Sequence, residues 1–136
     1  MEAQTVPSLP VTPFPLSDID EIATSSVQNT PLDDRTFALN EMTRAGLSLA
    51  KKGQLDAITR CESGWHQFDT DGKLLHGKVH YADVGYAQIN LDAHPNITGT
   101  MGYDVTTLKG NVDYGIYLFL TEGGIPWFPS MNCWNK

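Results

Sequence analysis

Proline is the residue that most limits what this chain can fold into, because it is concentrated at one end. Residues 1–31 hold five of the eight prolines, among Ser, Thr, Val and acidic residues. Proline has no backbone N–H and breaks helix interiors, so this composition cannot fill a core. We therefore predict an extended, Pro-rich acidic tail or linker over residues 1–31 and a single domain over residues 32–136.

The tail carries a few apolar side chains that a partner could cover. Val6, Leu9, Val11, Phe14 and Leu16 are spread along it. A segment of this kind is either a flexible spacer or an arm that becomes ordered only against a protein partner. Both interpretations remain open from the sequence.

Charge and hydropathy exclude several classes of function. The net charge is −7, and residues 1–35 hold six acids against one base. This leaves no basic surface of the kind that binds nucleic acid. The longest apolar stretch, residues 114–120, is too short to cross a bilayer. The start, Met1-Glu-Ala-Gln, lacks the basic and apolar segments of a signal peptide, so we expect a removed signal or another export route.

Apolar periodicity predicts two helices in the first half of the domain. After an acidic start at Asp33, apolar residues recur at three- and four-residue steps, at Leu39, Met42, Ala45 and Leu49. We expect Gly53 to interrupt or end this helix. A second helix carries Leu55, Ile58 and Glu62 at helical spacing and closes at Gly64.

The second half is predicted to be less regular until its last helix. Residues 66–82 are polar, with Asp71-Gly72 as the tight turn of a hairpin. Asp83 is expected to cap a short helix over residues 85–90. The last helix begins near Asn111 and stops at Gly123, and its buried stripe consists of Val112, Ile116, Phe119 and Leu120. The pattern therefore predicts an α+β fold, mainly helical, with a small β-hairpin.

Three ordered motifs resemble those of the soluble lytic transglycosylases, a family with a lysozyme-like fold. They are CESGW at residues 61–65, VGYAQIN at 84–90 and GNV at 110–112. In that family the corresponding motifs are a Glu-Ser-Gly-aromatic helix end, a Gly-Leu-Met-Gln-like segment across the cleft and an Asn-Ile helix start. The match covers roughly the last 85 residues, and the order of the motifs makes it specific. This chain departs from the pattern at Tyr86-Ala87, where the family has Leu-Met, and over residues 127–134, where the family has Ala-Tyr-Asn-Ala-Gly.

The resemblance implies a role for four residues of these motifs. Glu62 resembles the single acid and base of the family, and Ser63 the hydroxyl that orients the acetamido group of the sugar or the glutamate. Gln88 resembles the glutamine that lines the cleft. Asn111 resembles the asparagine that ties the site together. Burial beside Ile58 and a position near the end of a helix both favour a protonated Glu62 at neutral pH.

Five further residues complete the predicted glycan-binding set. Asn90 extends the polar lining, and Gly85 lets the backbone approach the glycan because it has no side chain. Either Tyr114 or Tyr117 is expected to approach the cleft. Among the three tryptophans, Trp127 is assigned to the glycan.

The two cysteines are predicted to form a disulfide. Cys61 and Cys133 lack the close spacing of a zinc knuckle or a redox motif, which leaves a disulfide favoured over free core thiols. Such a bridge would fasten the end of the chain beside the helix of Glu62. The four histidines lack the spacing of a zinc site, so no metal is assigned, and the family chemistry implies no cofactor.

The resemblance implies a reaction on a peptidoglycan glycan strand. Protonated Glu62 gives its proton to the oxygen between N-acetylmuramic acid and N-acetylglucosamine, and its carboxylate then takes the proton of the muramic 6-hydroxyl, which leaves a 1,6-anhydro product. One alternative is a lysozyme-type hydrolase in which Asp69, Asp71 or Asp83 directs water. A second is a non-catalytic wall-binding or structural component of a virion or envelope machine. The expected location is extracytoplasmic, in the periplasm or envelope or secreted, or in a virion.

Overall fold

The computed structural model describes residues 31–95, 97 and 101–136. The predicted Pro-rich tail lies outside the described residues except for Pro31. Residues 34–136 form a compact unit. Its elements, in chain order, are α1 (Asp34–Arg44), α2 (Leu49–Ser63), β1 (Asp83–Val84), β2 (Ile89–Asn90), α3 (Leu108–Glu122), the 3-10 helix η3 (Ile125–Ser130) and α4 (Met131–Trp134).

The first two helices meet at a break that the periodicity did not predict. We expected one helix to continue through Leu49 as far as Gly53, and this is wrong. The chain turns at Gly46, where φ is +85°, and Ser48 then caps α2 by accepting a hydrogen bond from the backbone of Lys51. Gly53 is exposed inside α2, where its cost of about 1 kcal/mol relative to alanine is tolerated.

The end of α2 is confirmed. Gly64 adopts φ 64° and its N–H bonds to the carbonyl of Arg60, which is a left-handed helix cap. The helix therefore stops immediately after Glu62 and Ser63. Glu62 lies on the last turn, at the end of the helix that faces the irregular part of the fold.

The segment predicted as a short helix capped by Asp83 is instead the β-hairpin of the fold. Asp83 pairs with Asn90 and Val84 with Ile89, in antiparallel register. Gly85 and Gln88 in the connecting loop have φ +75° and +51°. An α-helix of L-residues does not allow these values, so the helical prediction is wrong here.

The hairpin predicted around Asp71-Gly72 forms only a turn. Phe68 and Leu74 make one isolated antiparallel bridge, and the Asp69 N–H donates to the Lys73 carbonyl at 2.7 Å. No strand of the described chain includes these residues. The tight turn was correctly placed, but the regular hairpin lies further along the chain.

Helix α3 is the central helix of the second half. It begins at Leu108, three residues before the predicted start, because the Thr107 side chain accepts from the Gly110 N–H. It ends at Gly123 as predicted. Three members of the predicted stripe are buried, but Leu120 is 50% exposed, which corrects that prediction.

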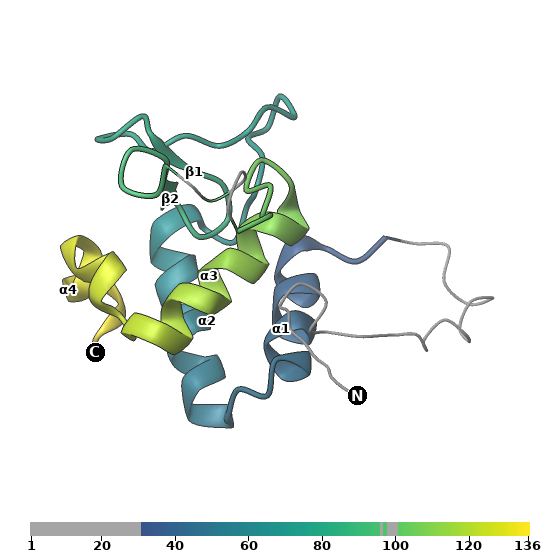
Figure 1. Ribbon diagram of the computed structural model, residues 1–136, viewed down its shortest axis with the longest axis vertical. Coiled ribbons are helices and arrows are strands. Elements are labelled where there is room, and N and C mark those ends of the chain that lie inside the picture. Colours follow the sequence, from purple (N-terminus) through teal and green to yellow (C-terminus); the bar gives the residue numbers. More distant parts are fainter. Residues whose placement is uncertain (1–30, 96, 98–100) are drawn as a thin grey trace. The chain divides into compact units, whose positions relative to one another are not determined.

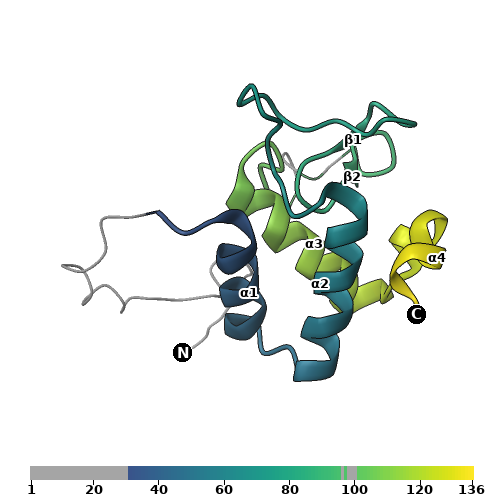
Figure 2. The ribbon, with the colours of Figure 1, turned by 180° about the vertical axis from the view of Figure 1, so that it is seen from behind.

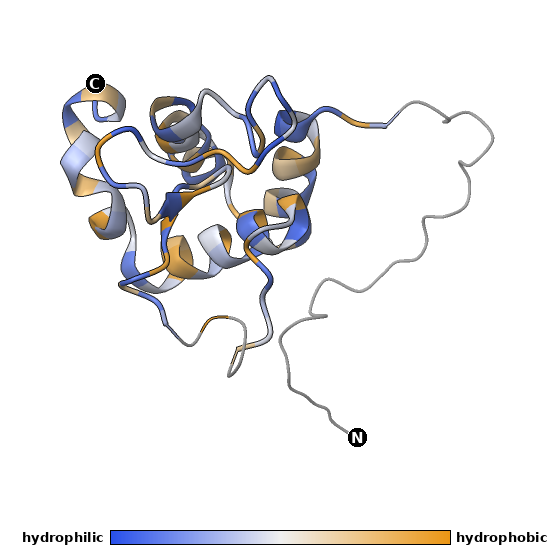
Figure 3. Cartoon of the chain, turned by 90° about the horizontal axis from the view of Figure 1, so that it is seen from above, coloured by the Kyte–Doolittle hydropathy of each residue, from blue (hydrophilic) through white to orange (hydrophobic). Residues whose placement is uncertain are grey.

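The helices are arranged around α2 and α3. Figures 1 and 2 show these two helices in the middle, with α1 on one flank, α4 on the other and the hairpin at one end. In Figure 3 polar and apolar residues alternate along the helices, as expected for amphipathic elements. The core joins α1, α2, the hairpin and α3 through fully buried side chains, among them Met42, Ile58, Ile89 and Ile116.

The fold is mainly helical with one small antiparallel sheet, which confirms the α+β prediction at that level. The predicted disulfide is also present. Cys61 and Cys133 are bonded, with their Cα atoms 6.1 Å apart. The bridge holds α4 against α2, and neither η3 nor α4 was predicted. Within the described part of the chain, none of the helices has the length and apolar character needed to cross a membrane.

Candidate active site

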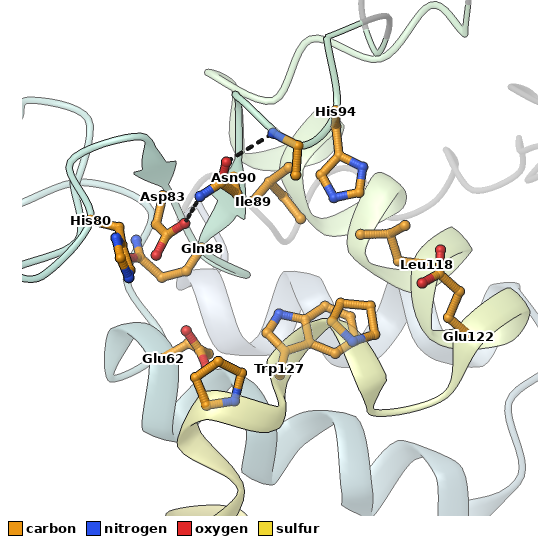
Figure 4. Close-up of a pocket in the computed structure, with 13 residues that line it drawn as sticks. Glu62, His80, Asp83, Gln88, Ile89, Asn90, His94, Leu118, Glu122 and Trp127 are labelled. Atoms are coloured by element: carbon orange, nitrogen blue, oxygen red, sulfur yellow. Dashed lines mark hydrogen bonds between the residues drawn. The ribbon is translucent and has the colours of Figure 1, made fainter.

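A cleft opens between the end of α2, the hairpin and η3. It consists of two adjoining cavities of about 440 and 540 Å³. The residues that line both are Glu62, His80, Asp83, Gln88 and Pro129. Figure 4 shows Glu62 on one side of this space and Asp83, Gln88 and Asn90 on the other. The end of helix α2 therefore faces the hairpin across the cleft.

Glu62 combines partial burial with a direct hydrogen bond. Ser130 Oγ donates to Glu62 Oε2 at 2.5 Å. Burial raises the pKa of the Glu62 carboxyl above its usual value, the hydrogen bond from Ser130 opposes this rise, and the negative charge of Asp83 adds to it. A carboxyl that lines a cleft and whose pKa is raised by burial lies in the environment expected of a general acid.

Asp83 brings a second carboxylate to the same cleft. Asn90 Nδ2 donates to Asp83 Oδ1 at 2.7 Å, as drawn in Figure 4. The Asn90 Oδ1 in turn accepts from the backbone N–H groups of Asp92 and Ala93, each at 2.9 Å. Asn90 therefore lines the cleft and also fixes the orientation of Asp83.

Gln88 and Trp127 form fixed walls of the cleft. Gln88 is 9% exposed, and its Nε2 donates to the Gly85 carbonyl at 3.0 Å. Trp127 is 3% exposed, and its Nε1 donates to the Ala87 carbonyl at 2.8 Å. Because each side chain is tied to the hairpin loop, neither has to be ordered when a ligand enters.

Asn111 lies behind the cleft rather than in it. The side chain is fully buried. Its Oδ1 accepts from the Ala87 N–H at 2.8 Å, and its Nδ2 donates to the carbonyls of Val84 and Val105, each at 2.9 Å. Gln67, which the motifs do not include, accepts from the Tyr86 N–H at 2.7 Å. Two buried amides thus hold the loop that carries Gln88.

The structure shows a different reason for a glycine at position 85 from the one that we predicted. A Cβ at this position would lie 2.3 Å from Asn111 Nδ2 and 2.5 Å from Gln67 Oε1. The glycine is buried and makes room for these two amides. It is not among the residues that line the two cavities.

The Ser63 hydroxyl is engaged with the backbone. It donates to the Tyr86 carbonyl at 2.7 Å and accepts from the N–H groups of Trp65 and His66 at 3.1 and 3.2 Å. The bond to Tyr86 joins the end of α2 to the hairpin loop, and the other two stabilise the turn that follows the helix. Ser63 also lines the larger cavity, next to Glu62.

The two candidate tyrosines, Tyr114 and Tyr117, lie on α3. Their rings form a cluster with that of Tyr103, which precedes the helix. Neither lines the two cavities. Tyr114 is 4% exposed and its hydroxyl is 3.0 Å from His94 Nδ1, and His94 lines the smaller cavity. Tyr117 is partly exposed. Tyr114 thus reaches the cleft only through His94.

Several residues of the cleft were not singled out from the sequence. His80, His94 and Glu122 line it, and Ser130 contacts Glu62. No spacing rule connects them, because they come from separate loops and helices. Among the described residues, no group of three His, Cys, Asp or Glu side chains is arranged to hold a metal.

Comparison with known proteins gives no match. No protein-family model matches the chain, and no curated protein or solved structure matches it.

Proposed function

We propose that this chain is a peptidoglycan lytic transglycosylase in which Glu62 is the single acid and base. The observation that carries the proposal is a half-buried carboxyl, with its pKa raised by burial, in the wall of a cleft large enough for sugar rings. The polar lining from Gln88 and Asn90 and the fixed indole of Trp127 support a carbohydrate ligand.

The reaction needs no water and no second carboxylate. Protonated Glu62 gives its proton to the oxygen between N-acetylmuramic acid and N-acetylglucosamine, and the bond from C1 to that oxygen breaks with its electron pair going to the oxygen. The resulting oxocarbenium-like centre is attacked by the muramic O6. The Glu62 carboxylate takes the proton of that hydroxyl. The products are a 1,6-anhydro end and a free hydroxyl, and Glu62 is again protonated.

The test is digestion of purified peptidoglycan with the products identified by mass. The wild-type protein should release 1,6-anhydromuramic ends, and Glu62→Gln should lower the rate by at least about 100-fold, since it removes the transferable proton. Asp71→Asn is the matched control, because Asp71 is an exposed carboxylate in the turn outside the cleft. A Glu62→Gln protein that folds and retains its rate would refute the assignment.

One observation favours a second candidate, a lysozyme-type hydrolase. Asp83 lines both cavities with Glu62, is oriented by Asn90 and is close enough for its charge to raise the pKa of Glu62. A second carboxylate in this place could direct water to the sugar. The products would then be reducing ends, heavier than the anhydro ends by one water, and Asp83→Asn would abolish them. Transglycosylation predicts anhydro ends that persist in Asp83→Asn.

The remaining alternative, a wall-binding module without turnover, predicts sedimentation with peptidoglycan and no soluble product. The Cys61–Cys133 bridge supports an extracytoplasmic or virion location, because disulfides persist in oxidising compartments. A role of the N-terminal tail in binding a protein partner stays a prediction.

A further inference from the structure

Ser130 reaches Glu62 from a segment that none of the sequence motifs includes. Its Oγ is 2.5 Å from Glu62 Oε2 and 3.1 Å from the indole Nε1 of Trp134. An indole N–H can only donate. Trp134 therefore occupies a lone pair of the serine oxygen and directs the hydroxyl proton elsewhere.

Two acceptors compete for that proton, and Glu62 is favoured. The Trp127 carbonyl is 3.1 Å from Ser130 Oγ, but this carbonyl also accepts from Trp134 Nε1 at 3.2 Å. The carboxylate oxygen is nearer and becomes charged when Glu62 gives up its proton. Hydrogen bonds to a charged acceptor are shorter and about twice as strong as neutral ones.

The disulfide fixes both partners of this hydrogen bond. Cys61 directly precedes Glu62, and Cys133 lies one helical turn after Ser130. The bridge therefore joins the backbone of the acid to the backbone of its hydrogen-bond donor. Ser130 is held beside Glu62 rather than meeting it by chance at the surface.

We propose that Ser130 is a positioning residue for the Glu62 acid: it holds Oε2 and leaves Oε1 to carry the transferable proton into the cleft. The inference rests on the proposed glycan-cleaving function. Once the proton has moved to the leaving oxygen, the same hydrogen bond stabilises the carboxylate that remains. Ser130 thus contributes more after proton transfer than before it, which is the condition for accelerating the step.

The proposal predicts a change in the titration of Glu62 and in the pH dependence of the reaction. The hydrogen bond from Ser130 lowers the pKa of Glu62 against the effect of burial, so its removal should raise that pKa. The acid form of Glu62 would then persist to higher pH. The other charged and titratable groups that line the two cavities are His76, Lys78, His80, Asp83, His94 and Glu122, and all of them are unchanged in a Ser130 variant.

The experiment compares Ser130→Ala, Ser130→Thr and Trp134→Phe with the wild type. Two quantities are measured: the alkaline limb of kcat/KM on peptidoglycan, and the titration of the Glu62 carboxyl carbon by NMR. Ser130→Ala should move both to higher pH and lower kcat/KM by about tenfold, the value of one charge-assisted hydrogen bond. Ser130→Thr should restore both, and Trp134→Phe, which keeps the serine, should shift them less. Thr43→Ala on α1 serves as a hydroxyl control outside the cleft.

The outcomes separate this inference from the proposed function. An unshifted Glu62 titration in Ser130→Ala, or an equal loss in Ser130→Thr, overturns the positioning role even if Glu62→Gln is inactive. An active Glu62→Gln overturns the proposed function, while the NMR titration still reports whether Ser130 controls the carboxyl. If Ser130→Ala does not fold, the titration of Trp134→Phe decides, and no shift there overturns the proposal.

Discussion

Replacing Asn111 with alanine tests how the site is held from behind. The substitution removes three buried hydrogen bonds, one from the Ala87 N–H and two to the carbonyls of Val84 and Val105. Val105 keeps the donation from Gln67 Nε2 at 3.1 Å, so the loss falls mainly on the Ala87 N–H and the Val84 carbonyl. A net value of about 0.5–1.5 kcal/mol per hydrogen bond gives a loss of roughly 3 kcal/mol in the free energy of unfolding.

The assay is urea or thermal unfolding followed by circular dichroism. For a unit of this size each kcal/mol lowers Tm by about 4–8 °C, so a decrease of roughly 12–24 °C is expected. Asn40→Ala is the matched control, since Asn40 is exposed on α1, and it should change stability by less than about 0.5 kcal/mol. A loss in Asn111→Ala within about 1 kcal/mol of this control would show that the buried amide does not hold the loop.

Two further predictions concern stability. The double variant Cys61→Ala/Cys133→Ala should lose about 4 kcal/mol in urea unfolding under oxidising conditions, because the bridge closes a loop with a sequence separation of 72; a loss below about 1 kcal/mol would contradict the loop-entropy argument. Burial and the neighbouring Glu41 carboxyl raise the pKa of Asp113 to about 7 despite the nearby Lys109. Because Asp113 binds its proton more tightly in the native state than in the unfolded state, its contribution to stability should be greatest at acid pH and be lost as the pH rises through about 7. The measurement is the difference between the urea midpoints at acid and at mildly alkaline pH. Asp113→Asn should make this difference smaller, and an unchanged difference would contradict the raised pKa of Asp113.

The parts of the fold that local chemistry decides were predictable from the sequence. Gly64 and Gly123 end their helices because a glycine cap is a local signal. The break between α1 and α2 was missed because apolar residues continue the helical period across it, and Gly46 and Ser48 outweigh that period. Gly53 does not end a helix, since the context of α2 outweighs a propensity difference of about 1 kcal/mol.

The hairpin depends on contacts between distant segments, which the periodicity of apolar residues does not reveal. The left-handed conformation of Gln88 is a feature of the folded loop, in which buried side chains from distant segments, Gln67 and Asn111, accept the backbone N–H groups of neighbouring residues. No short window of sequence contains these partners. The local sequence pattern therefore predicts a helix for residues that form two strands and a turn.

The candidate site also has residues that the sequence predicts and residues that only the fold brings together. Glu62, Gln88 and Asn90 belong to short motifs, and the structure brings all three to one cleft. Ser130 is 68 residues from Glu62 along the chain, so its contact was not encoded in any spacing. Asp83 was predicted as a helix cap and as one of three carboxylates that could direct water, and only the pairing of the strands places it opposite Glu62.

The wide separation between Glu62 and Ser130 along the chain also affects when their hydrogen bond can form during synthesis. A ribosome delivers helix α2 long before η3 and α4, so a nascent chain holds the glutamate without its serine or its cysteine partner. The hydrogen bond between Glu62 and Ser130 can form only after η3 has been made, and the disulfide that holds it requires oxidised thiols. Reduction of the Cys61–Cys133 bridge should therefore free the segment that carries Ser130 from the end of α2.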